Sequence, residues 1–342
     1  MRRATLIAFL LIANSLSAQS PQPYDGTPTV WDDTSTLGSQ AADNSSTRWI
    51  APDSRDPSKY VHFELGTIGL FREAPDSQLL AFDESFNPLL NANELQGSMQ
   101  FGLRAFMDVH NVSLGLGGTD LQLGYFGINS LDAERPLAAA EVNTVFFNSI
   151  PATPLQTANV LYSSNIYSGE ANLCFRNRKR VRPIAGLRYL KLEETYDAFN
   201  HDPSGGRLGG FSLTNNHLFG GQFGCAATLF RLGYFEFYSS GKFAVMHNRV
   251  DGSTSAADVS GTPVTKNFSD SEFATLLDVE AGTTYWLNDA MAFKLGYQLL
   301  YADDVAMGID QNASVRILSP GDTVAFNSQQ WHGLNLSAEF SF

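Results

Sequence analysis

Apolar and polar residues alternate with a period of two over much of this chain. Between 291 and 299, the odd positions hold Met, Phe, Leu, Tyr and Leu, and the even positions hold Ala, Lys, Gly and Gln. Such alternation places successive side chains on opposite faces of a β-strand. It predicts ten strands, at about 60–71, 97–106, 119–128, 159–176, 181–196, 212–229, 232–247, 272–287, 291–301 and 333–342.

The polar face of these predicted strands carries charged side chains in mid-strand, whereas the other face is almost purely aliphatic and aromatic. The charged positions are Glu64, Arg104, Glu170, Arg188, Glu236, Lys242, Asp278, Glu280, Lys294 and Glu339. Several strands run to twelve residues or more, which exceeds the usual strand of a soluble sandwich and matches a tilted membrane strand. The pattern favours an all-β fold: a transmembrane antiparallel up-and-down β-barrel with charges inside.

The predicted connections alternate between short and long. Short ones fall near 177–180, 230–231 and 288–290, with a modest one at 107–118, and long ones fall near 72–96, 129–158, 197–211, 248–271 and 302–330. Short periplasmic turns opposite long external loops are typical of outer-membrane barrels. Ten strands fit this alternation, and eight or twelve remain possible.

Aromatic residues, which make up 12% of the chain, gather toward the predicted strand ends. They include Tyr125, Phe126, Tyr189, Phe230, Tyr234, Tyr285, Trp286, Tyr301, Trp331 and Phe342. Aromatic rings are enriched at the headgroup level of membranes, where an apolar body meets a polar rim. We therefore expect them to form belts on the outer surface.

The two ends of the sequence carry targeting patterns. Arg2 and Arg3, an apolar run from Leu6 to Ala13 and small residues up to Ala18 predict a cleaved signal peptide over 1–18, read by the Sec pathway. Residues 19–59 are polar without a period, so we expect a flexible segment before a barrel at 60–342. The alternating stretch that holds Phe340 and Phe342 resembles the terminal signal that bacterial outer-membrane barrels present to their assembly machinery. The expected partners are this machinery and outer-membrane lipids, and the expected location is the bacterial outer membrane.

Charge and cysteine content narrow the alternatives further. The net charge of −13 argues against nucleic acid as a partner, because its phosphates would repel the chain. Cys174 and Cys225 fall on predicted strands, and we expect both to be small apolar surface residues. A disulfide would need their strands to be adjacent, and the sequence leaves that open.

Candidate catalytic and metal-binding residues lie in predicted external loops. His201–Asp202 and Asp303–Asp304 together have the composition of a rim protease, but such dipeptides are common in acidic loops. Asp303, Asp304 and Asp310 lack the glycine and bidentate glutamate of an EF-hand loop. We therefore expect no enzyme activity, no metal and no cofactor. The basic stretch 176–182 reads as a soluble turn or, alternatively, as a contact with anionic headgroups or the cell wall.

Three stretches resemble one family. They are "PIAGLRYLKLEE" (183–194), "NNHLFGGQFGCAA" (215–227) and "VEAGTTYWLNDAMAFKLGYQLLYADDVAMGIDQ" (279–311). They are similar to planctomycetal outer-membrane barrels grouped as the seventh putative β-barrel porin family, and the strand at 119–128 is similar more weakly. The resemblance implies a barrel and, through the family label, transport. It implies no functional residue.

The function depends on whether the lumen is open. Ten strands are nearer to the eight that side chains fill than to the sixteen that leave a water channel. Inward charges of both signs favour pairing across the lumen, whereas the inward glycines Gly102, Gly124, Gly186, Gly224 and Gly296 make room. We expect a porin-like narrow channel for small solutes, and we keep as the alternative a filled structural or adhesive barrel without transport. A rim-active enzyme is a third interpretation. The solute and the oligomeric state cannot be predicted.

Overall fold

The fold is described from a computed structural model, which covers residues 61–75, 79–83, 85, 87–95, 97–112, 118–138, 143–144, 157–175, 181–201, 207–257, 263–314 and 324–342. The predicted signal peptide and the predicted flexible segment 19–59 lie outside these residues. So do residues 176–180 of the basic stretch. In the part of the chain that is described, no helix is long and apolar enough to cross a membrane.

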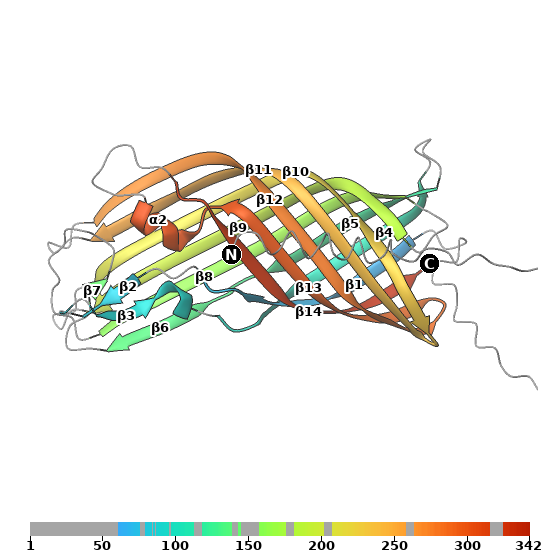
Figure 1. The fold of residues 1–342 in the computed structure, drawn as a ribbon, viewed down its shortest axis with the longest axis horizontal. Helices are drawn as coiled ribbons and strands as arrows, with labels where there is room; N and C mark the ends of the chain where they lie inside the picture. Colours follow the sequence, from blue (N-terminus) through green and yellow to red (C-terminus); the bar gives the residue numbers. More distant parts are fainter. Residues whose placement is uncertain are drawn as a thin grey trace, which may run out of the picture. The chain divides into compact units, whose positions relative to one another are not determined.

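Ten long strands form a closed antiparallel barrel, which confirms the predicted fold class and strand number. They are β1 (Val61–Arg72), β4 (Gln100–Val112), β5 (Thr119–Ile128), β8 (Thr157–Phe175), β9 (Val181–His201), β10 (Arg207–Leu232), β11 (Phe235–Ala257), β12 (Pro263–Asn288), β13 (Met291–Val305) and β14 (Asn327–Ser341). Each strand pairs with its neighbours in sequence. The ring closes because β1 pairs with β14, with Leu65 opposite Ala338. Figure 1 shows the tilted strands wrapping around the barrel axis.

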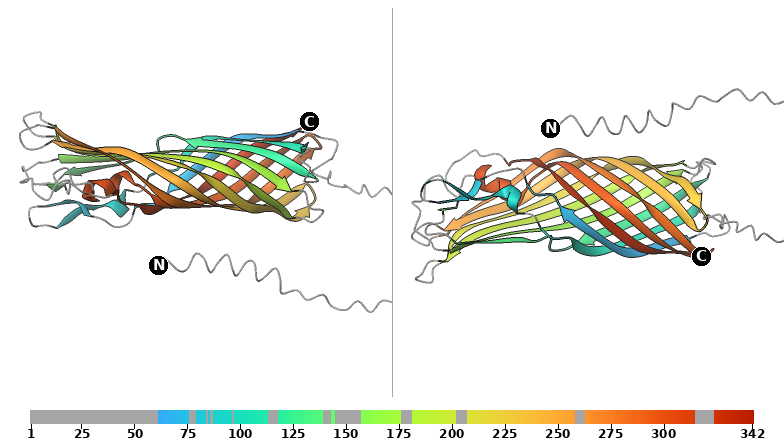
Figure 2. Two further views of the ribbon diagram at one scale, coloured as in Figure 1. Left: turned by 90° about the horizontal axis from the view of Figure 1, so that it is seen from above. Right: turned by 60° about the horizontal axis from the view of Figure 1, so that its bottom comes forward.

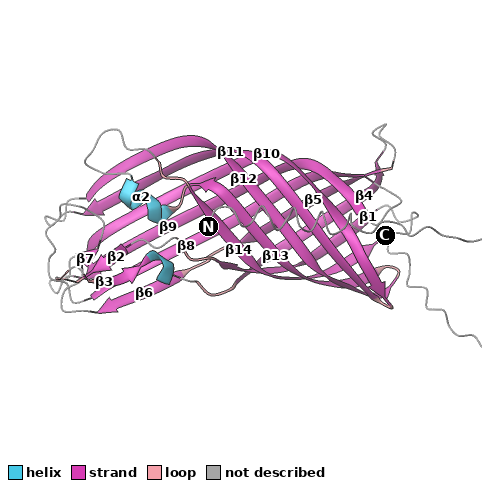
Figure 3. Ribbon diagram, viewed as in Figure 1, coloured by secondary structure: helices cyan, strands magenta, loops and turns pink. Residues whose placement is uncertain are grey.

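Shorter elements lie in the connections at one end of the barrel, which we call the long-loop end (Figures 1 and 3). β6 (Ala133–Ala138) pairs with residues 157–162 of β8, and β5 pairs with the later residues 166–175 of the same strand. β2 (Leu79–Phe82), β3 (Pro88–Asn91) and β7 (Asn143–Thr144) make a small separate sheet. The 3₁₀ helix η1 (Ala92–Glu94) and the helix α2 (Gly308–Ser314) complete the described elements.

Strands β9 to β12 are longer than the sequence pattern predicts. The predicted loops at 197–211 and 248–271 are wrong over most of their length, because pairing continues to Arg207 opposite His201 and to Ala257 opposite Pro263. Both faces of the sheet are largely polar there, so no apolar alternation marks the strands. The wall is therefore tall on one side: β10 has 26 residues and β5 has 10. Figure 2 shows the long strands continuing past their neighbours.

The two faces of the barrel wall differ as the alternation predicts. On β13, the outward side chain of Leu295 is 48% exposed, while the inward side chain of Gln298 is 3% exposed. Outward apolar side chains recur around the barrel at Leu103, Tyr125, Leu187, Phe223, Val245, Phe273, Phe293, Leu334 and Leu336. An outer face of this kind suits lipid.

Three of the predicted belt aromatics face the lumen instead. Phe126, Trp286 and Trp331 are buried, and their exposed fractions are 4%, 6% and 0%. Each directly follows or precedes an outward residue, such as Tyr125 or Tyr285, so the two-residue period itself turns it inward. The predicted belt is wrong at these positions, while Tyr125, Tyr189, Phe230, Tyr234, Tyr285 and Phe342 are exposed.

Candidate functional site

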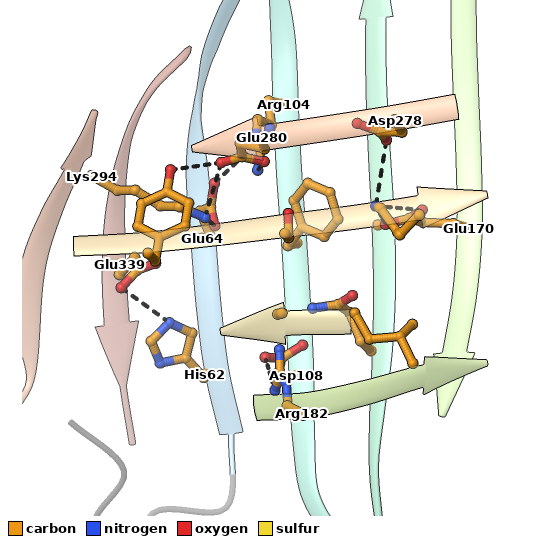
Figure 4. Close-up of a pocket in the computed structure, with 18 of the residues that line it drawn as sticks. His62, Glu64, Arg104, Asp108, Glu170, Arg182, Asp278, Glu280, Lys294 and Glu339 are labelled. Atoms are coloured by element: carbon orange, nitrogen blue, oxygen red, sulfur yellow. Dashed lines mark hydrogen bonds and ion pairs between the residues drawn. The ribbon is translucent and has the colours of Figure 1, made fainter. Parts of the chain in front are cut away.

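A polar cavity of about 160 Å³ lies in the lumen toward the end with short turns, and it is the candidate functional site. All ten charged residues singled out in the sequence line it, and Figure 4 labels seven of them. They come from β1, β4, β8, β9, β11, β12, β13 and β14. The barrel's closure thus brings residues that are up to 275 positions apart, Glu64 and Glu339, to one cavity.

Four of these charges form one group around Arg104. Its guanidinium lies 3.0 Å from a Glu64 oxygen and 2.8 Å from a Glu280 oxygen. Lys294 Nζ contacts the same two carboxylates at 3.1 Å and 3.4 Å. Tyr238 donates a hydrogen bond of 2.6 Å to Glu280. The dashed contacts in Figure 4 mark several of these pairs.

A second group of four lies beside the first. Arg188 is 2.7 Å from Asp278 and 3.7 Å from Glu170, while Lys242 is 2.7 Å from Glu170 and 3.5 Å from Asp278. Gln298 joins the two groups, since it accepts a 3.0 Å hydrogen bond from Arg104 and donates one of 2.8 Å to Asp278.

We call these eight charged residues the central tier: Glu64, Arg104, Glu170, Arg188, Lys242, Asp278, Glu280 and Lys294. Four acids and four bases make it electroneutral at pH 7. Its contacts cross the lumen, because the strands of Arg104 and Glu280, β4 and β12, are separated by β1, β14 and β13 along the wall. All eight are buried or nearly so. These charges are therefore paired across the lumen, beside the cavity that they line.

A second set of polar residues lies closer to the short turns, and we call it the turn-side tier: His62, Asp108, Arg182, Glu236, Trp286 and Glu339. Its contacts are looser. Arg182 lies 3.4 Å from Asp108, and His62 lies 3.6 Å from Glu339. Glu236 pairs at 2.6 Å with Arg231, outside the central tier. Of the ten sequence candidates, Glu236 and Glu339 belong to this tier.

On the other side of the central tier, apolar side chains fill the lumen. Along β9, the inward positions after Arg188 are Leu190 and Leu192. Along β12, the inward positions beyond Asp278 are Leu276 and Ala274, and all four are buried. We call this layer the apolar ring: Ile68, Leu70, Phe126, Ile128, Ile166, Leu190, Leu192, Leu218, Ala244, Met246, Ala274, Leu276, Leu300, Ala302 and Trp331. In channels, apolar constrictions act as gates because they lose water.

The chain after β13 turns into the mouth of the barrel above this ring. Val305, Ala306, Met307 and Ile309 are buried there, and we call 305–311 the plug segment. Asn216 holds Ala306 by two hydrogen bonds of 2.8 Å, one to its carbonyl oxygen and one from its amide. The Gly308 amide donates a 2.9 Å hydrogen bond to Glu194.

The carboxylate that holds the plug segment is itself fixed by buried partners. Glu194 is 0% exposed; it lies 3.3 Å from Arg72 and accepts a 2.5 Å hydrogen bond from Tyr162. Arg72 also donates to Tyr162 and, at 3.1 Å, to Gln329. Arg72 and Glu194 could not be predicted as site residues from the apolar pattern. Arg72 is the last residue of β1, and the neighbours of Glu194, Glu193 and Thr195, are polar, so no apolar face marks the direction of its side chain.

The inward glycines do not open the lumen as the sequence suggested. A Cβ atom at Gly124 would lie 2.3 Å from the Phe106 ring, and one at Gly296 would lie 2.5 Å from the Tyr238 hydroxyl. The space beside these two glycines is therefore occupied by large side chains of other strands, Phe106 of β4 and Tyr238 of β11.

The other chemical candidates do not assemble into a site in the described residues. Asp303 and Asp304 lie on β13 rather than in a loop, and Asp310 lies on α2, where it accepts a hydrogen bond from Asn327. His201 ends β9, and Asp202 lies outside the described residues. No group of three His, Cys, Asp or Glu residues suited to a metal occurs there. The absence of catalysis stays a prediction.

The two cysteines are on opposite faces of the wall and are both free. Cys225 is exposed on the outer face, as expected for a small surface residue. Cys174 is buried on the inner face, two positions from Asn172, so its predicted surface position is wrong.

The sequence and the fold can be compared with those of known proteins. No curated protein matches the sequence. Three solved barrels are similar in structure. The outer membrane protease OmpT of Escherichia coli is 9% identical, the match covers 83% of this chain and 97% of that chain, and the TM-score is 0.47. The toluene transporter TbuX of Ralstonia pickettii is 8% identical, with 83% and 90% of the two chains covered and a TM-score of 0.35, and the toluene transporter TodX of P. putida is 9% identical, with 84% and 91% covered and a TM-score of 0.34. Likenesses of this degree say nothing about activity.

The comparison with protein-family models shows the family to which the chain belongs. The family model described as putative beta barrel porin-7 (BBP7) matches residues 127–342, from the end of β5 to Phe342. The matched part holds all the barrel strands from β8 to β14 and six of the eight central-tier residues. This confirms the resemblance drawn from the sequence. The chain is an outer-membrane β-barrel that belongs to the putative beta barrel porin-7 family.

Proposed function

We propose that this porin-like barrel is closed in its resting state and serves as a filled structural barrel of the outer membrane. The observation that carries the proposal is the sequence of three layers in the lumen. The electroneutral central tier, the apolar ring and the plug segment succeed one another along the barrel axis. An ion would have to part paired charges, cross an apolar layer and displace a hydrogen-bonded segment.

The narrow channel for small solutes is the second candidate function, and one feature favours it. After Val305 the plug segment is no longer a strand of the wall, and side chains such as Asn216, Glu194 and Asn327 hold it to the barrel. Its displacement would leave the apolar ring and the central tier as the remaining barriers. A channel of this protein would thus open only after a rearrangement at the long-loop end.

Conductance in planar lipid bilayers separates the two functions. The wild-type protein should show no steady single-channel current in 1 M KCl. A variant in which residues 305–311 are replaced by glycine and serine should stay silent too, because the apolar ring remains.

A double variant that combines this replacement with Trp331→Ala, which removes the largest side chain of the ring, should conduct. Steady current through the wild-type protein would overturn the filled barrel. Current after replacement of the plug segment alone would instead support a gated channel.

A further inference from the structure

The turn-side tier differs from the central tier in how well its polar atoms are satisfied. Every charged side chain of the central tier has its buried atoms hydrogen-bonded. In the turn-side tier, four buried atoms have no hydrogen-bond partner among the described residues: Asp108 Oδ1, Arg182 Nε, Trp286 Nε1 and Glu236 Oε2. Glu236 Oε2 has an ion pair with Arg231 at 2.6 Å, and the residues of the other three atoms all line the cavity. Buried polar atoms left in this state are uncommon and call for an explanation.

The three atoms have complementary chemistry. Asp108 Oδ1 is a carboxylate acceptor, while Arg182 Nε and Trp286 Nε1 can only donate. The 3.4 Å hydrogen bond between these two residues runs from Arg182 Nη1 to Asp108 Oδ2. Arg182 Nε and Asp108 Oδ1 therefore remain able to bind a ligand. Trp286 is 6% exposed, so its indole group is turned into the protein rather than toward lipid or water.

Each acid of the tier has one basic partner: Arg182 for Asp108, Arg231 for Glu236 and His62 for Glu339. Of these acids, Asp108 keeps a buried carboxylate oxygen that neither a hydrogen bond nor its ion pair uses. The acids are spread over β4, β11 and β14 and do not form a metal-binding group. A ligand for such a lining needs an ammonium group for the Asp108 oxygen and an acceptor group for the two donors.

We propose that the turn-side tier binds a small zwitterion that carries an ammonium and a carboxylate group, of the size of a free amino acid. Its ammonium group would bind near Asp108, and its carboxylate would accept from Arg182 Nε and Trp286 Nε1. The cavity of about 160 Å³ has room for such a molecule. The tier lies within a few residues of the short turns, which face the periplasm in outer-membrane barrels, so the ligand would enter from the periplasm.

The binding experiment uses the folded chain in lipid nanodiscs and isothermal titration calorimetry. The zwitterionic probes are glycine, β-alanine and 4-aminobutanoate, which differ in the separation of their charges. Methylammonium and acetate test each charge alone. At least one zwitterion should bind ten-fold or more tightly than both single-charge probes. Equal binding of methylammonium, equal binding of acetate, or no binding by any zwitterion (a cavity that holds water only) would each overturn the proposal.

Conservative variants locate the ligand. Asp108→Asn removes a charge and Trp286→Phe removes one N–H group, and each should weaken binding by five-fold or more. Trp331→Phe is the matched control, because Trp331 is also buried with an unpaired Nε1 but lies in the apolar ring, away from the cavity lining. Binding should be unchanged in that variant. Equal losses in Trp286→Phe and Trp331→Phe would overturn the assignment.

A second readout does not depend on the stability of the variants. In ¹⁵N-labelled wild-type protein, the indole N–H signal of Trp286 should shift on addition of the zwitterion, and that of Trp331 should stay in place. A shift of neither signal, or of both equally, would refute the site.

Discussion

Lys242 is the residue on which the pairing in the central tier can be tested most directly. Its ammonium group lies 2.7 Å from Glu170 and 3.5 Å from Asp278. In Lys242→Ala, Glu170 keeps only the 3.7 Å contact with Arg188 and a hydrogen bond from Gln222. Removing one partner of a buried pair costs about 3–5 kcal/mol. We expect a loss of this size in the free energy of unfolding, measured by reversible unfolding in lipid vesicles, and no ion leak, because the apolar ring and the plug segment remain in place.

The control for this prediction is Lys191→Ala. Lys191 pairs with Glu193 at 2.5 Å on the outer face, where both side chains are partly exposed. Exposed pairs contribute about 0–1 kcal/mol, so this variant should unfold almost as the wild type does. If Lys242→Ala kept its stability and only shifted ion selectivity toward cations, the lumen would be an open pore.

At the residue scale, the sequence predicts which side chains face the lumen but not whom they meet. The two-residue period alone assigns Arg104 and Glu280 to the inner face. Their contact depends on how far the strands tilt and where the ring closes, and no local pattern encodes either quantity. For the same reason, the sequence does not predict that Gln298, an uncharged residue, joins the two groups of charges by its hydrogen bonds to Arg104 and Asp278.

At the scale of elements, the position of the outward side chains of β13 in the membrane can be tested with arginine substitutions at two depths. Leu295 lies in the middle of these side chains, between Phe293 and Tyr297. Arginine at the centre of the lipid face of a barrel costs about 2–4 kcal/mol, and near the interface about 0–1 kcal/mol. Leu295→Arg should therefore destabilise the barrel by the larger amount in reversible unfolding in lipid. Ser271→Arg, at an exposed outward position of β12 toward the long-loop end, should show the smaller one. Equal losses would contradict the depths that we assign to the two positions.

The plug segment is a second element whose attachment can be tested. Glu194→Gln keeps the shape of the side chain but removes the charge that Arg72 contacts at 3.3 Å and weakens the bond to the Gly308 amide. Amide hydrogen exchange at Ala306 and Gly308 should accelerate by ten-fold or more, because local opening becomes easier. Exchange in the middle of β10 and β11 should not change. Uniform acceleration over the whole barrel would mean that Glu194 stabilises the fold rather than the plug segment.

The elements that the sequence predicts well are those with one apolar face. The upper parts of β9 to β12 lack such a face: Ser212 and Thr254 point inward, while Asn215 and Ser253 lie on the outer face. Cross-strand pairing extends them, and pairing is a property of neighbours rather than of one segment. The plug segment was missed for the opposite reason. Residues 305–307 and Ile309 are buried without a regular period, so they fit neither a strand nor a helix pattern.

For the molecule as a whole, the seam between β1 and β14 decides whether the barrel exists. Its edge is held by hydrogen bonds between Val61 and Phe342, from the Phe342 amide at 3.0 Å and from the Val61 amide at 3.4 Å. The Phe342 ring beside this edge is 75% exposed, so it contributes little to packing within the barrel. We propose that the ring is exposed because the assembly machinery binds it before the seam closes.

Phe342→Asp tests this idea, because it keeps the backbone of the seam and changes only the exposed ring. The fraction of folded, heat-modifiable protein in the outer membrane should fall several-fold, while barrels that do fold should unfold at nearly the wild-type denaturant concentration. Phe273→Asp is the matched control: that ring is 70% exposed on the outer face of β12, which is separated from β14 by β13 and takes no part in the seam. If both variants lost folded protein equally, the effect would follow from placing a charge on the outer face. If Phe342→Asp assembled normally, the ring would have no part in assembly, and the closure of the barrel would rest on strand pairing alone.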